Sequence, residues 1–228
     1  MIIYLEERAE VRRQATLNQI RNALTTAFKI KLPMVRAQVE SLRSRRSYTN
    51  AEVERVIQHQ TLKNSLATRL ALQAGLRAHE LATLRRLDEL QPSSHRTWDE
   101  RLFAGLEDVV IYVVVGKGGL RRKVPIPSAL AVLLEARRLS LPQLVWDRGI
   151  KYELCYDVGF GQAFSQSFSA ASKNALGLSR GAHGLRHSYA KNRTLTLRSI
   201  FGSQDIAQRI VSQELGHFRP DITLAYYR

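Results

Sequence analysis

The sequence contains very little cysteine, with Cys155 the single one among 228 residues. One cysteine cannot form an intrachain disulfide framework, and it leaves no site at which several thiolates bind a metal ion. Disulfides belong to oxidising compartments, so this usage favours a protein of the reducing cytoplasm.

Long hydrophobic runs are also missing. The purely apolar stretches are short, as in VVIYVVV at 109–115, whereas a helix that spans a bilayer needs roughly 20 apolar residues. The first residues, MIIYLEERAEVRR, contain no apolar run of signal-peptide length followed by a cleavage site. We therefore expect no membrane partner.

Acidic residues are few relative to basic ones. The chain has 35 Lys and Arg against 20 Asp and Glu, a formal net charge of +15. Such an excess favours a polyanionic partner, with nucleic acid first and an anionic membrane surface a distant second. A basic protein without such a partner is the alternative. With 44% hydrophobic and 24% charged residues, the chain has the composition of a globular protein large enough to bury a core.

The first 47 residues are rich in arginine and mostly helical in pattern. Spaced apolar residues predict a helix within 7–30, and Pro33 is expected to open a second short helix that continues through Leu42. The segment SLRSRRSYTN at 41–50 has the composition of a basic linker. Because about fifty residues cannot readily build an independent core, we interpret 1–47 as a basic helical arm or part of a domain, ahead of a domain at 48–228.

The rest of the sequence is mainly helical in pattern, with one small antiparallel sheet. Thr49 and Glu52 form a capping-box pattern at a helix start. The β-branched run 109–115 precedes GKGG and RRKVPIP, a pattern typical of a β-hairpin. Further helices are expected at 61–75, 79–90, 129–138, 161–176, 184–193 and 203–215. The predicted fold class is therefore α+β, mainly α with a small antiparallel β-sheet.

Four short segments hold the side chains that could carry chemistry. They are GLRAHEL at 75–81, VVGKGG at 114–119, HGLRHSYA at 183–190 and LGHFRPDITLAYY at 215–227. Their arginines, lysine, histidines and tyrosine suit the cleavage of a phosphodiester. Guanidinium groups can hold non-bridging oxygens bidentately, a lysine at a hairpin tip can protonate a leaving oxygen, and a tyrosine hydroxyl can attack phosphorus.

In this order, the four segments resemble the catalytic domain of the tyrosine recombinase (phage integrase) family. The first arginine of that family lies in a G-L-R-x-x-E-L segment, which Arg77 and Glu80 match here. The lysine of the family lies in a G-K-G turn between two strands, which Lys117 matches. The resemblance covers residues 47–226, and 1–47 would then be a basic arm or the remnant of a core-binding domain.

Two further motifs complete the resemblance. An H-x-x-R motif followed by a second histidine is matched by His183, Arg186 and His187. An L-G-H motif precedes the nucleophilic tyrosine of the family by nine residues, and counting from His217 reaches Tyr226. Each motif is weak evidence alone, and the ordered set is specific.

The resemblance implies a transesterification that needs no metal ion, no ATP and no other cofactor. Tyr226 would attack a DNA phosphate, form a 3′-phosphotyrosyl link and free a 5′-hydroxyl. A second hydroxyl would then reverse the reaction on a new partner strand. The enzyme would thus be a site-specific DNA recombinase or integrase.

The resemblance also implies a role for each matched residue. Arg77 and Arg186 would clamp the phosphate, and Lys117 would protonate the leaving 5′ oxygen. His183 would act in acid–base transfer, and His217 would hydrogen-bond a non-bridging oxygen.

Other residues are expected to support this site or to contact DNA. Glu80 would buttress the first arginine, and His187 would pack in its helix or support the site. The basic residues expected at the DNA backbone are Arg43, Arg45, Arg46, Arg121, Arg122 and Lys123. The implied partners are double-stranded DNA and further copies of the chain, as a tetramer on DNA, in the cytoplasm and at the nucleoid if the protein is bacterial.

Several of these residues have a structural interpretation as well. Arg77 and Glu80 could be an ordinary i,i+3 ion pair, and Lys117 could be a solvated lysine at a hairpin tip. Tyr226 could be a packing residue. Tyr227 is its neighbour, about 100° away on a helix, so only one of the two can point into a site.

A zinc interpretation is open for His183, His187 and His217, because the first two are spaced i,i+4. Against it, no Cys, Asp or Glu stands at a suitable ligand spacing beside them. An arginine directly before His187 would also repel a cation. No metal is therefore expected.

The cations at 121–123 could be solvated charges instead of phosphate contacts.

The sequence departs from the family pattern in three places. Only about 47 residues precede the catalytic segment, where a core-binding domain is usual, so a fragment or an arm that replaces part of that domain is expected. The interval from Arg186 to His217 is 31 residues, longer than usual, and an inserted loop at 194–205 is expected to absorb it. The chain stops two residues after Tyr226, where many relatives have a segment that docks onto a neighbouring protomer.

Two competing functions remain open. A type IB topoisomerase would use the same chemistry but reseal the original strand. A non-catalytic DNA-binding protein could use the same fold without cleaving DNA.

Overall fold

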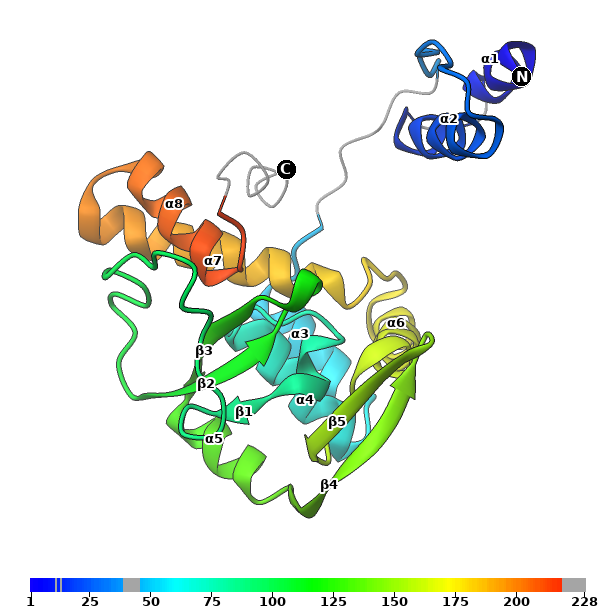
Figure 1. The fold of residues 1–228 in the computed structure, drawn as a ribbon. Coiled ribbons are helices and arrows are strands. Elements are labelled where there is room, and N and C mark those ends of the chain that lie inside the picture. The colour runs from blue at the N-terminus through cyan, green and yellow to red at the C-terminus, as the bar shows by residue number, and fades with distance from the viewer. Residues whose placement is uncertain (11, 13, 39–45, 219–228) are drawn as a thin grey trace. The chain divides into compact units, whose positions relative to one another are not determined.

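The structure is a computed structural model that describes residues 1–10, 12, 14–38 and 46–218 (Figure 1). Arg43, Arg45, Tyr226 and Tyr227 lie outside these residues. By its internal contacts the chain divides into two compact units, Met1–Arg45 and Arg46–Arg228. The predicted roles of the two parts, an arm at 1–47 and a catalytic domain at 48–228, stay predictions.

The first unit contains helices α1 (Ile2–Ala9) and α2 (Gln14–Phe28). The helix expected from Pro33 is wrong over 33–38, which are not helical. The side-chain amide of Gln14 provides the reason, because it donates to the carbonyl of Val35 (3.0 Å) and accepts from the backbone N–H of Ala37 (2.9 Å). These bonds tie the segment to the first residue of α2.

The second unit begins with helices α3 (Asn50–Ile57) and α4 (Leu62–Gln73). The predicted capping box is confirmed, because the Thr49 hydroxyl accepts from the N–H of Glu52 and the Glu52 carboxylate accepts from that of Thr49. Gly75 follows α4 in the left-handed region (φ +61°), where an added Cβ would lie 2.6 Å from the ring of Tyr189. Glycine is therefore required at this turn.

The helix predicted over 79–90 is wrong. A 3-10 turn, η1 (Glu80–Thr83), leads into the short strand β1 (Arg85–Arg86). The physical reason is tertiary, because the buried Glu80 carboxylate binds arginines and the Thr83 hydroxyl accepts from the N–H of Val115 in the sheet (3.0 Å).

The predicted β-hairpin is confirmed. Strands β2 (Val109–Val115) and β3 (Arg121–Pro127) pair antiparallel and join β1 in the order β1-β2-β3. Their connection contains the turn η2 (Lys117–Gly119), and Val115 pairs with Arg121 beside it. Lys117 therefore lies at a hairpin tip. Helix α5 (Ser128–Glu135) follows directly.

A second antiparallel sheet was not predicted. It consists of β4 (Arg138–Asp147) and β5 (Ile150–Tyr156), which meet at a two-residue turn. Pro142 within β4 and the exposed residues around it obscure the alternation that normally reveals a strand.

Three helices complete the described part: α6 (Gly161–Leu176), α7 (His183–Phe201) and α8 (Gln204–Glu214). The loop expected at 194–205 is wrong, because α7 continues to Phe201. Gly202 ends it in the left-handed region and Ser203 caps α8. The long interval before His217 is thus taken up by helix. Figure 1 shows α7 and α8 side by side, and their facing residues form a small core.

The fold is mainly α with small antiparallel sheets, as predicted for the α+β class. The larger core lies between α3, α4, α6 and the β1-β2-β3 sheet. Among the described residues, no helix is both long and apolar enough to cross a membrane.

Candidate active site

Arg77 is held in place by the residue three positions after it. Its guanidinium Nη1 donates to Glu80 Oε1 (2.7 Å), and its backbone N–H donates to Glu80 Oε2 (2.8 Å). The side chain of Arg77 is 20% exposed, whereas that of Glu80 is 0% exposed. This pair is therefore a half-buried anchor rather than a solvated helix pair.

Three arginines share the Glu80 carboxylate. Arg77 lies 2.7 Å, Arg122 2.7 Å and Arg186 3.6 Å from its oxygens. Burial alone would raise the pKa of Glu80, but the charges of Arg122, Arg186 and Arg77 hold that pKa well below its usual range. Glu80 is thus an ionised carboxylate at the centre of a cationic cluster, and the predicted buttressing role of Glu80 stays a prediction that this geometry supports.

Arg122 is buried, with 1% of its surface exposed. Its guanidinium donates to the carbonyl oxygens of Glu214 (2.7 Å) and Gly75 (3.3 Å) as well as to Glu80. This burial does not fit the DNA contact predicted for Arg122. Its neighbours Arg121 and Lys123 point the other way along β3 and are exposed.

Arg186 is also buried, at 0% exposure. Its guanidinium donates to the carbonyls of Gly75 and Leu215, and so connects the turn before Arg77 to the turn before His217. Because both terminal nitrogens are engaged with backbone oxygens, Arg186 organises the cluster and does not line the pocket described next.

A small pocket of about 180 Å³ brings together three of the residues predicted to be catalytic: Arg77, Lys117 and His217. Glu80, Arg122 and Gly216 also line it. Gly216 has φ +72°, and an added Cβ there would lie 3.0 Å from Arg122 Cδ. The glycine of the L-G-H motif therefore lets the chain pass close to Arg122 and turn His217 into the pocket.

His217 faces Arg77 across this pocket, with 3.1 Å between His217 Nε2 and Arg77 Nη2. A guanidinium only donates, so His217 Nε2 is the acceptor and the ring is neutral. Burial and then the charges of Arg186, Arg77 and Arg122 lower the pKa of His217 to about 4. The pocket is thus positively charged without a charge on the histidine.

His183 and His187 stand at the start of α7, with ring centroids 5.2 Å apart in an edge contact. His187 is buried, whereas His183 is partly covered and partly open to solvent, and neither lines the small pocket. Partial burial, His187 and Arg186 lower the pKa of His183. Among the described residues, no group of three or more His, Cys, Asp or Glu is placed to hold a metal ion.

Of the other predicted DNA contacts, Arg46 is described and exposed. The structure therefore gathers the first arginine, the lysine and the L-G-H histidine at one pocket, with the second arginine directly behind them.

Comparison with solved structures identifies the fold. No protein-family model and no curated protein sequence matches the chain. XerH site-specific recombinase bound to a palindromic difH substrate aligns with 98% of this chain at TM-score 0.58 and 19% identity. Lambda integrase bound as a dimer to a COC′ core site aligns with 94% at TM-score 0.58 and 19% identity. The Tn1549 transposon integrase in complex with transposon right-end DNA aligns with all of it at TM-score 0.57 and 14% identity.

The fold is that of the tyrosine recombinase catalytic domain. The alignments cover 64% of the XerH chain, 74% of the lambda integrase chain and 78% of the Tn1549 integrase chain. The chain thus spans less than two thirds of XerH.

Sequence reasoning missed one part of this recombinase fold, a buried network around Glu214. Its carboxylate accepts from the Tyr189 hydroxyl (2.9 Å), from Arg193 Nη2 (2.7 Å) and from the N–H of Phe103 (3.0 Å). Glu214 directly precedes the L-G-H motif, so this network anchors the turn that carries His217. In the sequence, the i,i+4 spacing of Tyr189 and Arg193 places both side chains on one face of α7, which could have indicated that they share a partner.

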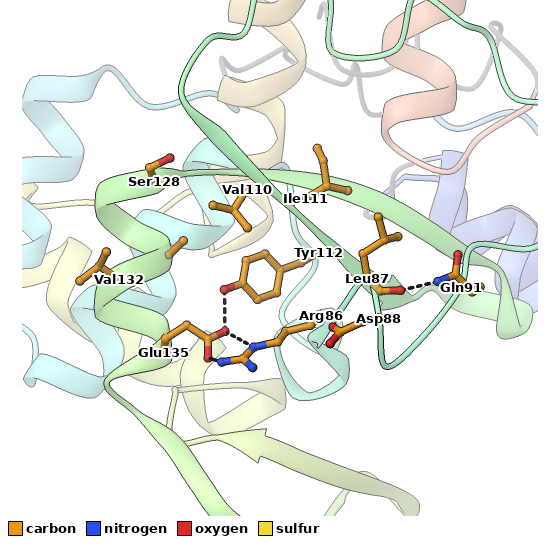
Figure 2. A pocket seen from close by; sticks show the side chains of 11 residues that line it. Arg86, Leu87, Asp88, Gln91, Val110, Ile111, Tyr112, Ser128, Val132 and Glu135 are labelled. Carbon is orange, nitrogen blue, oxygen red and sulfur yellow. Dashed lines mark hydrogen bonds and ion pairs between the residues drawn. The ribbon is translucent and has the colours of Figure 1, made fainter.

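A wider cavity of about 880 Å³ lies beside β2 and α5 and contains none of the predicted site residues (Figure 2). Figure 2 shows the Glu135 carboxylate facing Tyr112 and Arg86, which donate to it at 2.7 Å and 3.1 Å. The remaining lining is largely apolar. This carboxylate-centred arrangement is unsuited to a phosphate, so the small cationic pocket is the candidate site.

Proposed function

We propose that this chain is a site-specific DNA recombinase or integrase that cleaves and rejoins strands through a 3′-phosphotyrosyl intermediate. The observation that carries the proposal is the convergence of Arg77, Lys117 and His217 on one pocket. These groups are far apart in sequence, and a pentacoordinate phosphate needs such donors around its oxygens. Structures with this fold that are bound to DNA support the choice of substrate.

Arg77 would be the main contact for the phosphate. Glu80 fixes Arg77 Nη1 and leaves the guanidinium partly exposed at the pocket. Arg186 is fully buried, so it would act on the phosphate through its positive charge. To contact the phosphate directly, it would have to give up its hydrogen bond to the carbonyl of Gly75 or of Leu215. His217 would hydrogen-bond a non-bridging oxygen once its ring is protonated.

The proposed chemistry exchanges one phosphoester for another. The Tyr226 oxygen forms a bond to phosphorus and the bond from phosphorus to the 5′ oxygen breaks. The tyrosine proton passes to a base, for which His183 is our candidate, and Lys117 gives a proton to the leaving oxygen. Because the phosphotyrosine retains an ester bond, the strand can be rejoined without ATP or a cofactor. We propose that the protein acts on double-stranded DNA as a tetramer. Its location would be the cytoplasm.

A nicked suicide substrate tests the proposal, because a fragment that diffuses away after cleavage traps the covalent protein–DNA adduct. We expect an adduct that forms in EDTA, is lost in Tyr226→Phe and persists in Tyr227→Phe. Loss of the adduct with chelator would favour a metal site at the histidines. Tight binding without any adduct would favour the non-catalytic DNA-binding alternative.

A further inference from the structure

The tip of the β4–β5 hairpin is fixed next to the segment that carries Arg77. Arg148 and Gly149 form its turn with φ of +50° and +76°. The Asp147 carboxylate accepts from the N–H of Gln162 (2.9 Å) at the start of α6. The N–H of Gly161 in turn donates to the carbonyl of Ala78 (2.8 Å), the residue after Arg77. The tip is therefore connected, through the start of α6, to the segment that carries Arg77.

This tip forms one wall of a cleft of about 860 Å³ that continues from the small pocket. The cleft shares Arg77, Gly116 and Lys117 with that pocket. Lys117 belongs to the β2–β3 tip, so two hairpin tips face each other across the cleft. Lys117 also lines a further cavity of about 500 Å³, together with Arg96.

The charge of the cleft is strongly positive. The described residues that line it include five cations and one carboxylate: Arg77, Arg85, Lys117, Arg148, Lys151 and Glu153. Glu153 is paired with Arg85 (3.1 Å), so it does not offset the others. Arg148 is 58% exposed although it contacts Asp147, and Lys151 is exposed. Arg148 contacts Asp147, whose side chain is only 9% exposed, through Nε, so its terminal nitrogens can reach a ligand while that pair stays in place.

Apolar surface lies between these charges. Ile150 and Tyr152 from the hairpin and Val115 from β2 also line the cleft. Cations at the rim and apolar groups between them match a nucleic-acid strand, whose phosphates and sugar faces alternate. An acidic peptide would match only the rim.

We infer that this cleft holds the DNA backbone on one side of the scissile phosphate, with Arg148 and Lys151 contacting phosphates that are not cleaved. The inference rests on the proposed function, since it assigns the path of the same substrate. Phosphates recur every ~3.4 Å of helix axis along each strand, so a strand that leaves the small pocket along the cleft brings the next ones to the β4–β5 tip. These two residues would position DNA and take no part in the chemistry.

The test compares two double variants with the same charge change. Arg148→Gln with Lys151→Gln removes the tip cations. Arg69→Gln with Arg137→Gln is the control, since both residues line a separate cavity of about 620 Å³ that shares no residue with the cleft. Binding of a short mixed-sequence duplex is measured over a range of salt concentrations.

Each phosphate contact contributes about 0.9 to the slope of log K against log salt, so the tip variant should lose about 1.8 from the slope. The control should keep the slope of the wild type. Equal slopes for the tip variant and the control would overturn the inference.

A single-cysteine cross-link separates DNA from a protein partner. The native Cys155 is buried, so Lys151→Cys can be labelled selectively with a photo-cross-linker. We expect cross-links to DNA from position 151 and none from Arg137→Cys. Cross-links from position 151 only to a second protein copy would overturn the inference.

The two proposals can fail separately. A normal suicide-substrate adduct with an unchanged slope in the tip variant would remove the cleft assignment alone. A reduced slope without any wild-type adduct would remove the strand-transfer proposal and leave the cleft as a DNA-binding site.

Discussion

Arg122 and Glu80 form an ion pair that is buried on both sides, with 2.7 Å between Arg122 Nη2 and Glu80 Oε2 and exposures of 1% and 0%. Glu80 uses its other oxygen to hold Arg77. Arg122 also binds the carbonyl of Glu214, which precedes the L-G-H turn. One buried guanidinium thus connects the two halves of the candidate site, Arg77 and His217.

Replacing Arg122 should therefore destabilise the protein. Arg122→Met should lower the free energy of unfolding by about 3–5 kcal/mol, because it leaves a buried carboxylate and backbone oxygens short of partners. Arg121→Met, one residue away on the exposed face of β3, should stay within about 0.5 kcal/mol of the wild type. Urea unfolding monitored by circular dichroism measures both. Equal losses in the two variants would contradict the assigned position of Arg122.

The titration of Glu80 should make the free energy of unfolding depend on pH in the acidic range. Burial would raise its pKa, but Arg122, Arg186 and Arg77 hold that pKa below the ordinary value of 4.5. A carboxyl with a lowered folded-state pKa contributes stability that is complete above its unfolded pKa and is lost as the pH falls toward the folded value. At neutral pH, Glu80→Gln should cost about 3–5 kcal/mol.

The difference in unfolding free energy between the wild type and Glu80→Gln should therefore become smaller as the pH falls below 4.5. Unfolding free energies at a series of pH values measure this. The exposed Glu54→Gln, which loses a surface pair with Arg69, serves as the control and should cost less than about 1 kcal/mol. A difference that stays constant on acidification would exclude Glu80 as the titrating group.

Sequence patterns predicted those elements whose structure follows from local residues. The hairpin at 109–127 and helix α6 match their predicted positions because β-branched runs, glycines and helical periodicity act locally. The helix predicted over 79–90 failed because Glu80 and Thr83 bond to distant partners. The β4–β5 sheet was missed because its exposed strand carries Pro142 and no clear alternation.

The candidate site was predictable to a similar extent. The motif resemblance selected Arg77, Lys117 and His217, which the fold brings to one pocket. Three adjacent cations at 121–123 looked equivalent, yet the strand buries the middle one. Side chains alternate between the two faces of a strand, and Val124 and Ile126, two and four positions after Arg122, are buried. The alternation therefore indicates that Arg122 faces the core. Its partners, however, come from distant segments and could not be read locally.

DNA binding should shift the protonation of His217. In the free protein its Nε2 accepts from Arg77, and burial and then the arginine charges lower its pKa to about 4. A phosphate at this place favours the protonated ring, so binding should take up a proton. The affinity of the wild type should then increase more between about pH 7 and about pH 5 than that of His217→Gln, which cannot titrate. Fluorescence anisotropy at constant ionic strength measures both, and parallel pH dependences would refute proton uptake by this residue.

If Lys117 is the general acid, the effect of replacing it should depend on whether the leaving group needs a proton. Lys117→Met should slow formation of the covalent adduct about 10²–10⁴-fold, the usual contribution of a positioned acid. A substrate with sulfur in place of the 5′ bridging oxygen should restore the rate, because a thiol is far more acidic than an alcohol and the sulfur can leave as the thiolate without a proton.

Arg77→Met should not be rescued by this substrate, since it lacks a phosphate contact and not a proton donor. Rapid-quench measurements on both substrates separate the two defects. If sulfur restored neither variant, Lys117 would act at this hairpin tip by binding DNA rather than by protonating the leaving oxygen.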